Sequence, residues 1–323
     1  MIDLRSGLVA ACLVAAGGSA ALAQEFPLTI DHAYGQTTIE AQPQRVLTWG
    51  WVAHDVVLDL GVVPVGLPRV SYGGDAEGVS PWTREALEEL GAELPPILGE
   101  AAGEVSLEAM LALEPDVILA PYSGMTEEEY TALSQFADVI PFKTQAWRGA
   151  WQDTVAVIGQ ALGLETEAQA LIAETEAMIA ATTENHPQIA GKTVLNFVNR
   201  DDGTVSVRTS ADPRSLLLTD AGLVSVAREA ADANGYTYFV SHENFADLDA
   251  DILVAFLDSP EAADAFFALP YIASAPQVAE GRVAVVDDEA VTMAVGGAIS
   301  PLSLRWGWEA FIGPIAEAAE NAR

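Results

Sequence analysis

Apolar and polar positions alternate along this chain with two different periods. Short runs rich in β-branched residues are followed by stretches whose apolar residues recur at helical spacing. Such alternation of strands and helices is typical of layered α/β structure. In the first part of the chain it predicts strands at 45–49, 63–66, 117–120 and 139–142, and helices at 55–60, 107–113 and 127–136. These elements are sufficient for one lobe built on a parallel sheet.

A second alternating series begins near Thr193. It predicts strands at 193–198 and 282–287, helices at 215–222 and 302–319, and a helix followed by a strand over 245–257. The chain therefore has the material for a second lobe, in keeping with a length of 323 residues, which exceeds the usual size of one domain.

The segment between the two series has few strand-forming residues. Residues 165–184 have high helix propensity throughout, and a helix of this length would extend about 30 Å, enough to span two lobes. Pro187 and Gly191 then interrupt the pattern. We expect an N-terminal α/β lobe at 24–153, a linking helical segment at 154–188 and a C-terminal α/β lobe at 189–323.

The first residues have the pattern of a secretory signal. Arg5 precedes a small-apolar run from Gly7 to Ala21, and an Ala-x-Ala sequence ends at Ala23. This run is too short to span a bilayer, so we expect cleavage after Ala23 and export of a soluble protein. Cys12, the single cysteine, lies inside the apolar run and not at its end, which argues against lipid attachment. The mature chain then holds no cysteine and no disulfide.

Charge narrows the range of partners. The chain has 47 acidic and 14 basic residues, a formal net charge of -33, and no cluster of basic residues. Such a chain repels a phosphate backbone, so nucleic acid is excluded as the expected partner. The acidity itself suits a soluble surface in salty or acidic surroundings.

Two short segments in the two halves echo each other. Ser106-Leu107-Glu108 precedes the apolar run at 117–119, and Ser241-His242-Glu243 precedes the run at 252–254. In each, a serine is placed to cap a helix that carries a glutamate in its first turn and leads into a buried strand. Taken alone, each glutamate is explained by its favourable interaction with the helix dipole.

Several motifs resemble the periplasmic substrate-binding proteins of ABC importers for iron-siderophore complexes, haem and vitamin B12. They occur in the order of that family over nearly the whole mature chain: Pro43-x-Arg45-Val46-Leu47, Leu60-Gly61-Val62-Val63-Pro64-Val65-Gly66, Leu107-Glu108-x5-Glu114-Pro115-Asp116-Val117-Ile118, Tyr130-x2-Leu133-Ser134-x-Phe136-Ala137, Ala161-Leu162-Gly163, Leu269-Pro270, Gly281-Arg282-Val283 and Ser300-Pro301-Leu302-Ser303.

The resemblance implies an α/β fold of two Rossmann-like lobes with mostly parallel sheets, joined by a single long helix, with the ligand in the cleft between them. It also implies that Glu108 and Glu243 dock against arginines of the membrane permease. Two separated charge pairs would fix orientation as well as affinity. The expected protein is a monomeric, periplasmic binding protein without enzymatic activity or cofactor, whose ligand is an Fe(III)-siderophore complex.

In a two-lobe α/β binder, loops at the carboxyl ends of the strands supply the ligand contacts. The candidate ligand-binding residues in and near such loops are Trp49, Trp51, Arg69, Tyr72, Trp82, Arg84, Tyr122, Trp147, Arg148, Arg200, Arg208, Tyr236 and Tyr238. Aromatic side chains with a few arginines suit a large, partly apolar, anionic chelate. Tryptophans near strand ends are also common packing residues, and the arginines have structural carboxylates as alternative partners.

Other ligands and activities stay open. Haem and corrinoids belong to the range of ligands that the resemblance implies, and the sequence does not choose among catecholate, hydroxamate and carboxylate siderophores. A bare metal ion needs three or four convergent ligands, whereas the four histidines lie apart without metal-ligand spacing, so we expect no direct metal site. A secreted α/β hydrolase would need a nucleophile motif such as Gly-x-Ser-x-Gly, which does not occur, and we place no catalytic residue.

Overall fold

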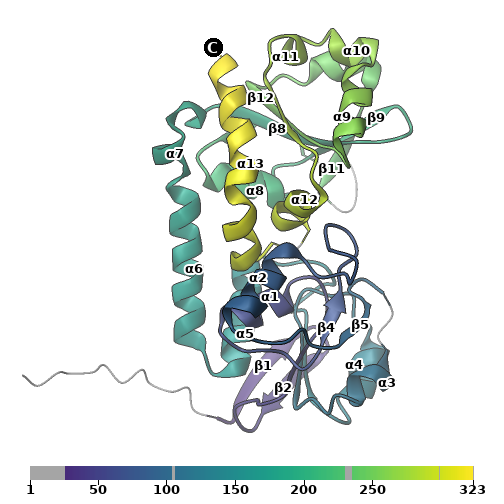
Figure 1. Ribbon diagram of the computed structural model, residues 1–323, viewed down its shortest axis with the longest axis vertical. Coiled ribbons are helices and arrows are strands. Elements are labelled where there is room, and N and C mark those ends of the chain that lie inside the picture. Colours follow the sequence, from purple (N-terminus) through teal and green to yellow (C-terminus); the bar gives the residue numbers. More distant parts are fainter. Residues whose placement is uncertain (1–25, 104–105, 230–234, 298, 323) are drawn as a thin grey trace, which may run out of the picture.

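The computed structural model describes residues 26–103, 106–229, 235–297 and 299–322. The expected signal peptide at 1–23 and Cys12 lie outside these ranges. The two halves of the chain form two α/β lobes, one above the other in Figure 1. Each lobe has parallel strand pairs and covering helices. The predicted α/β class with parallel sheets is confirmed.

In the N-terminal half, short parallel strands form the sheet. Strands β3 (Val46–Thr48), β6 (Val117–Ala120) and β7 (Asp138–Pro141) pair in the order β3-β6-β7, and β4 (Leu67–Arg69) pairs with β5 (Ile97–Glu100). A single bridge from Leu47 to Gly66 links the two groups. An antiparallel hairpin of β1 (Leu28–His32) and β2 (Gly35–Ile39) lies against β7.

Five helices accompany these strands: α1 (Ala53–Asp59), α2 (Pro81–Glu89), α3 (Leu107–Leu111), α4 (Glu127–Leu133) and α5 (Trp151–Leu162). Local chemistry explains their ends. Thr126 and Glu129 form a capping box at the start of α4, and Pro81 occupies the first turn of α2, where its missing N–H costs nothing. Gly163 ends α5 in the left-handed region at φ 70°.

The C-terminal half has a larger mixed sheet in the order β11-β9-β8-β12-β13. Its centre is parallel: β8 (Thr193–Asn199), β12 (Ile252–Phe256) and β13 (Val283–Val286). Its edge is antiparallel: β9 (Thr204–Arg208) and β11 (Thr237–Ser241). The two-residue strand β10 (Val224–Ser225) pairs with the start of β8.

Short helices surround this sheet: α8 (Pro213–Asp220), the 3-10 helix η2 (His242–Asp247), α9 (Pro260–Phe267), α10 (Pro270–Ala273), α11 (Pro276–Ala279) and α12 (Glu289–Gly296). The chain ends in α13 (Pro301–Asn321), which begins with a capping box between Ser300 and Ser303.

One helix connects the two halves along the chain, as predicted, and a second packs beside it across their junction. Helix α6 (Glu165–Ala180) is the predicted connection, but it is shorter than 165–184, because the chain turns at Ala181 into α7 (Thr182–Asn185) and the 3-10 helix η1 (Pro187–Ile189). Helix α13 lies beside α6 and also contacts α1 and α2 of the N-terminal half (Figure 1). The predicted division at residues 153 and 188 remains a proposal, and α5, which begins at Trp151, packs on α1 and β1.

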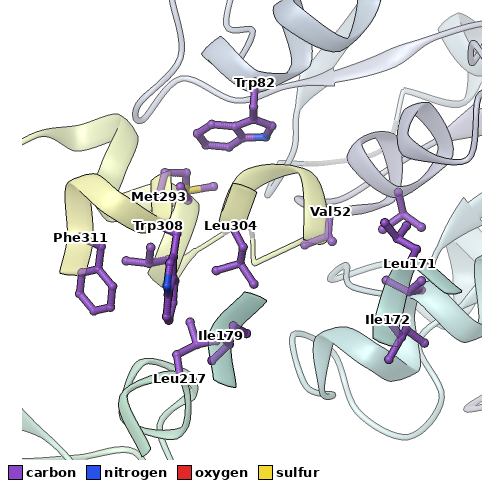
Figure 2. Packing of buried hydrophobic residues seen from close by; sticks show 14 of the residues in the cluster. Val52, Trp82, Leu171, Ile172, Ile179, Leu217, Met293, Leu304, Trp308 and Phe311 are labelled. Carbon is purple, nitrogen blue, oxygen red and sulfur yellow. The ribbon is translucent and has the colours of Figure 1, made fainter. Parts of the chain in front are cut away.

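These helices carry the main hydrophobic core from one half to the other. Figure 2 shows Leu304, Trp308 and Phe311 of α13 with Trp82 on one side and Ile179 and Leu217 on the other. Trp308 and Phe311 are almost fully buried, at 4% and 0% exposure. This side of the contact between the halves is therefore packed shut by apolar side chains.

A buried carboxylate fixes α13 to the N-terminal half. Asp55 of α1, 0% exposed, accepts hydrogen bonds from Nε1 of Trp82 at 2.8 Å, Oγ1 of Thr83 at 2.9 Å and Oγ of Ser300 at 3.0 Å. His54 adds a contact at 3.4 Å. Burial raises the pKa of Asp55, while these donors stabilise its charged form. One side chain thus joins α1, α2 and the N-cap residue of α13.

Some predicted elements differ from the structure. The strand predicted at 63–66 lies instead at Leu67–Arg69, because residues after α1 are used in the turn, and Val65 and Gly66 make only an isolated bridge to β3. The helix predicted after Ser241 is the 3-10 helix η2, and the Ser241 side chain makes no capping bond, whereas Ser106 does accept one from the Ala109 N–H at 3.4 Å. The two echoing segments are therefore not equivalent in structure.

Candidate functional site

Three loops meet at the carboxyl ends of the N-terminal strands. Trp51 follows β3, Tyr122 follows β6, and Trp147 follows β7. The Trp51 N–H donates to the carbonyl of Tyr122 at 3.3 Å, and the Trp147 N–H donates to the carbonyl of Ser123 at 3.2 Å. Gly50, at φ 88°, permits this approach, because a Cβ there would lie 2.3 Å from the Tyr122 carbonyl oxygen.

The rings on these loops form one aromatic cluster. The centroid of Trp147 lies 4.9 Å from that of Trp51 and 5.9 Å from that of Tyr122. Trp147 has φ 58°, a left-handed conformation that is unfavourable for a bulky residue. Strain of this kind is held in place by its surroundings and is concentrated at functional sites. The cluster is thus a candidate wall of a binding site.

The first cavity, about 470 Å³, opens between the two halves and against this cluster. The N-terminal half contributes Tyr122 and the segment 148–152, and the C-terminal half contributes Tyr236 and part of α8. Its lining consists of Val52, Tyr122, Arg148, Gly149, Ala150, Trp151, Gln152, Thr154, Ala211, Pro213, Leu216, Leu217, Asp220, Tyr236, Gly296, Gly297 and Ile299. The volume falls in the range of small-molecule sites.

A second cavity of about 380 Å³ adjoins the first, since Gly296 and Gly297 line both. Its remaining lining is Trp51, Arg69, Val70, Ser71, Tyr72, Glu100, Ala101, Ala102, Arg214, Thr292 and Met293. We call the two cavities together the cleft. It lies between the same two halves that α6 and α13 join.

Two arginines of the C-terminal half share one carboxylate beside the cleft. Nη1 of Arg214 lies 3.4 Å from both oxygens of Asp212, and Nε of Arg208 lies 3.9 Å from one of them. The Nε atoms of both arginines are buried and have no hydrogen-bond partner within the described chain. Burial, and secondly the charge of Arg214, lowers the pKa of Arg208 to about 10. Gly296 makes room for this cluster, because a Cβ there would lie 2.3 Å from Nε of Arg214.

A third arginine, Arg148, lines the first cavity. The guanidinium carbon of Arg148 lies 4.6 Å from the ring centroid of Tyr236, within the range of a cation–π contact. Burial is the main cause that raises the pKa of the nearby Tyr122; Tyr236 and Asp212 raise it further, whereas Arg214 and Arg148 oppose the rise. The site therefore combines arginines, tyrosine hydroxyls and aromatic faces.

The structure brings some of the candidate ligand-binding residues together. Trp51, Arg69, Tyr72, Tyr122, Arg148 and Tyr236 line the cleft. Trp147 packs on two of these rings, and Arg208 lies behind Arg214.

The other candidates do not line the two cavities. Trp49 and Trp82 are each 1% exposed and lie in the core, where Trp82 is used by Asp55. The partners of Arg84 are Asp75 and Glu77, and Arg200 pairs with Asp202 at 3.3 Å and lies over Phe239. Tyr238 packs under Arg228. The many aromatic residues and arginines in these loops predicted a binding site. They did not show which side chains would line the cleft.

Sequence reasoning missed Trp151, Arg214 and the pair Gly296-Gly297 as parts of the site. The two glycines are the last residue of α12 and its C-cap. A signal for Arg214 was available: Asp212-Pro213 is a helix start, with Asp212 accepting from the Arg214 N–H at 2.9 Å. Glu108 and Glu243 are both exposed, on α3 and η2.

Among the residues that the structure describes, no group of three or more His, Cys, Asp or Glu side chains is arranged to hold a metal ion. None of the helices in this same part of the chain combines the length and the apolar character needed to cross a membrane.

Comparison with known proteins agrees with this architecture. The family model of periplasmic binding proteins matches residues 70–290. The ferric enterobactin-binding periplasmic protein FepB of Escherichia coli is 24% identical over 88% of this chain and 92% of its own length. The Fe(3+) dicitrate-binding periplasmic protein FecB of Escherichia coli is 28% identical over 52% of this chain, which spans about half, 53%, of that relative.

A solved structure is similar over almost its whole length. PiaA of Streptococcus pneumoniae in complex with ferrichrome superimposes with a TM-score of 0.79 and 35% identity, covering 91% of this chain and 99% of that one. The protein described here belongs to the periplasmic binding protein family.

Proposed function

We propose that this protein is the extracytoplasmic substrate-binding component of an ABC importer and that it carries a ferric siderophore in the cleft. The observation that carries the proposal is the pair of adjoining cavities between the two halves, with aromatic rings and arginines from both. Binding needs no chemistry from the protein: rings pack against the organic part of the chelate, and arginine N–H groups donate to its oxygens. The relatives are binding proteins rather than enzymes, and the proposal assigns no catalytic residue.

The named relatives support iron chelates as the ligand class. FecB is named for ferric dicitrate, FepB for ferric enterobactin, and the PiaA structure contains ferrichrome. With ferric chelates as the ligand, the iron arrives already coordinated, so the protein needs no metal ligands of its own. Haem and corrinoids are the alternative ligands, and a titration that includes them tests the choice.

We further propose that the protein acts in the periplasm as a monomer, after removal of residues 1–23, and that it meets the permease through Glu108 and Glu243. Both side chains are exposed, which a docking contact requires. The two helices that join the halves favour a modest closure of the cleft over a wide hinge motion.

Ligand binding is tested by titrating the mature protein with a panel of ferric siderophores, haem and a corrinoid while following tryptophan fluorescence. Trp51 and Trp147 are placed to report on the cleft. Saturable quenching by a ferric siderophore at micromolar or lower concentration supports the proposal. Quenching by haem or a corrinoid alone would show that one of these is the ligand in place of a siderophore. Hydrolysis of generic esters would show that the protein is an enzyme and not a binding protein.

Docking is tested separately by charge reversal. The double variant Glu108→Lys, Glu243→Lys should keep the affinity for the chelate, since neither residue lines the cleft, and should abolish uptake in a transport assay. The pair Glu128→Lys, Glu174→Lys makes the same change in net charge on exposed helix positions and should leave uptake intact. A loss of chelate affinity in the first variant would refute the docking role.

A further inference from the structure

The charges that line the cleft are nearly balanced, although the ligand class alone would suggest a strongly cationic site. Four arginines lie in or directly behind it: Arg69, Arg148, Arg208 and Arg214. Carboxylates match them. Glu100 lies 3.1 Å from Arg69, and Asp212 is shared by Arg208 and Arg214.

Further carboxylates surround the same space. Asp220 lines the first cavity, and Glu176 accepts a hydrogen bond from the side chain of Gln152, another lining residue, at 3.1 Å. At the second cavity, Asp258 lies 3.5 Å from the hydroxyl of Tyr72, and Glu289 lies 3.5 Å from the N–H of Gly73. Glu176, Asp258 and Glu289 do not line the cavities themselves, and the carboxylates around the cleft exceed the arginines only when these neighbours are counted.

The net charge of the whole molecule also disfavours a polyanionic ligand. A formal net charge of -33 repels polyanions at long range, and the cleft lining offsets it little, because its three arginines face the two carboxylates Glu100 and Asp220. Like charges brought together in a binding site cost several kcal/mol. The walls contributed by Trp51, Tyr122, Trp151 and Tyr236 are aromatic and suit an uncharged organic shell.

Ferric siderophores differ in charge by their donor groups. Three hydroxamates, each singly negative, balance Fe³⁺ and give a neutral complex, whereas three catecholates, each doubly negative, leave a trianion. We infer that this cleft selects neutral ferric chelates of the hydroxamate type and discriminates against catecholate trianions. The inference rests on the proposed function and narrows its ligand class. The PiaA structure, which contains ferrichrome, is consistent with it.

The arginines then act as hydrogen-bond donors and not as counter-ions. Arg214 is best placed for this, because it lines the second cavity beside the shared Gly296 and its Nε has no partner within the described chain. Asp212, shared with Arg208, offsets part of its charge and holds it in position. Such a group can donate to the oxygens of a neutral chelate without attracting a polyanion.

The test compares two chelates of opposite class on the mature, full-length binding protein. By fluorescence titration, ferrichrome should bind at least about 100-fold more tightly than ferric enterobactin, the difference expected from a few kcal/mol of charge repulsion. Equal or tighter binding of ferric enterobactin overturns the inference while leaving the proposed function standing. Binding of neither chelate, nor of ferric dicitrate, overturns both.

A variant identifies the charge balance as the cause. Asp212→Asn keeps a good helix N-cap but uncovers Arg208 and Arg214, and should shift the affinity ratio about 10-fold toward ferric enterobactin. Glu174→Gln, an exposed carboxylate on α6, makes the same change in net charge away from the cleft and should leave the ratio unchanged. An equal shift in both variants would overturn the role of Asp212. If Asp212→Asn does not fold, the wild-type ratio still decides.

Discussion

The two halves of this molecule meet on two sides that differ sharply. On one side, α6 and α13 pack the gap shut with apolar residues such as Leu304 and Trp308, and the carboxylate of Asp55 there is fully buried and hydrogen-bonded. On the other side, the same halves leave a cleft lined by rings and by arginines that are paired at longer distances. The dry side fixes the halves relative to each other, and the polar side is left free to receive a ligand.

Substitution of two tryptophans, one on each side, should have opposite effects on stability and on ligand affinity. Trp82→Ala removes a ring that is 1% exposed and a donor to Asp55, so it should lower the free energy of unfolding by about 3–5 kcal/mol. The measurement is urea denaturation, followed by a chelate titration under conditions in which the variant is folded. Affinity should be unchanged. A variant of normal stability that has lost its ligand would place Trp82 in the cleft.

The matched change on the cleft side is Trp147→Ala. It removes a ring that packs on Trp51 and Tyr122 and is only partly buried, so stability should change little. The affinity for the chelate should fall about 10- to 100-fold, as for the loss of an aromatic anchor in a binding site. Isothermal titration calorimetry measures this loss. Unchanged affinity would limit the aromatic cluster to a packing role.

The sequence predicts the individual strands and helices of this molecule better than it predicts which of them pack together. The strands at 117–120 and the long helix at 165–180 follow from local periodicity, because a buried strand or a helix face must repeat its apolar positions. The second bridging helix was predicted as a helix, but its place beside α6 was not, since an apolar face does not say which partner covers it. The hairpin at 28–39 carries mostly polar and short residues, and its pattern was not recognised.

The residues of the candidate site could also be predicted only in part from the sequence. The loops after β3, β6 and β7 could be identified because the carboxyl ends of parallel strands gather at one edge. In the loop after β3, Trp49 turns into the core and Trp51 lines the cleft. Strand alternation would place residues two apart on the same side, so the change of direction comes from the turn at Gly50, whose φ is 88°. Arg214 and Gly296 come from distant parts of the chain, and only the fold shows that the glycine makes room for the arginine.

The link between Asp55 and α13 gives a smaller effect on the dry side. Ser300→Ala removes both the N-cap of α13 and a buried donor to Asp55, and should cost about 1–2 kcal/mol in urea denaturation. Ser259→Ala is the control, because Ser259 caps α9 in the same way but has no such contact with a buried carboxylate. The Ser300 variant should lose about 1 kcal/mol more than the control, the contribution of one buried hydrogen bond. Equal losses would show that the bond to Asp55 contributes nothing beyond the cap.

The smallest effect is a dependence of stability on pH through His54. Burial lowers the pKa of His54, and the nearby charge of Asp55 only partly offsets this. A lowered pKa means that the unfolded chain binds the proton first, so the stabilising contribution is present above pH 6.5 and is lost as the pH falls toward the pKa of the folded state. Asp55 acts in the opposite direction at lower pH, because its raised pKa makes protonation favour the folded chain.

His54→Gln should therefore flatten the fall in melting temperature between about pH 7 and pH 5.5, by less than the equivalent of about 1 kcal/mol. His32, whose pKa burial also lowers, contributes equally to both proteins and cancels in the comparison. Identical pH profiles for the variant and the parent would show that His54 binds its proton as readily in the folded chain as in the unfolded one, and that the dry side of the junction admits charge after all.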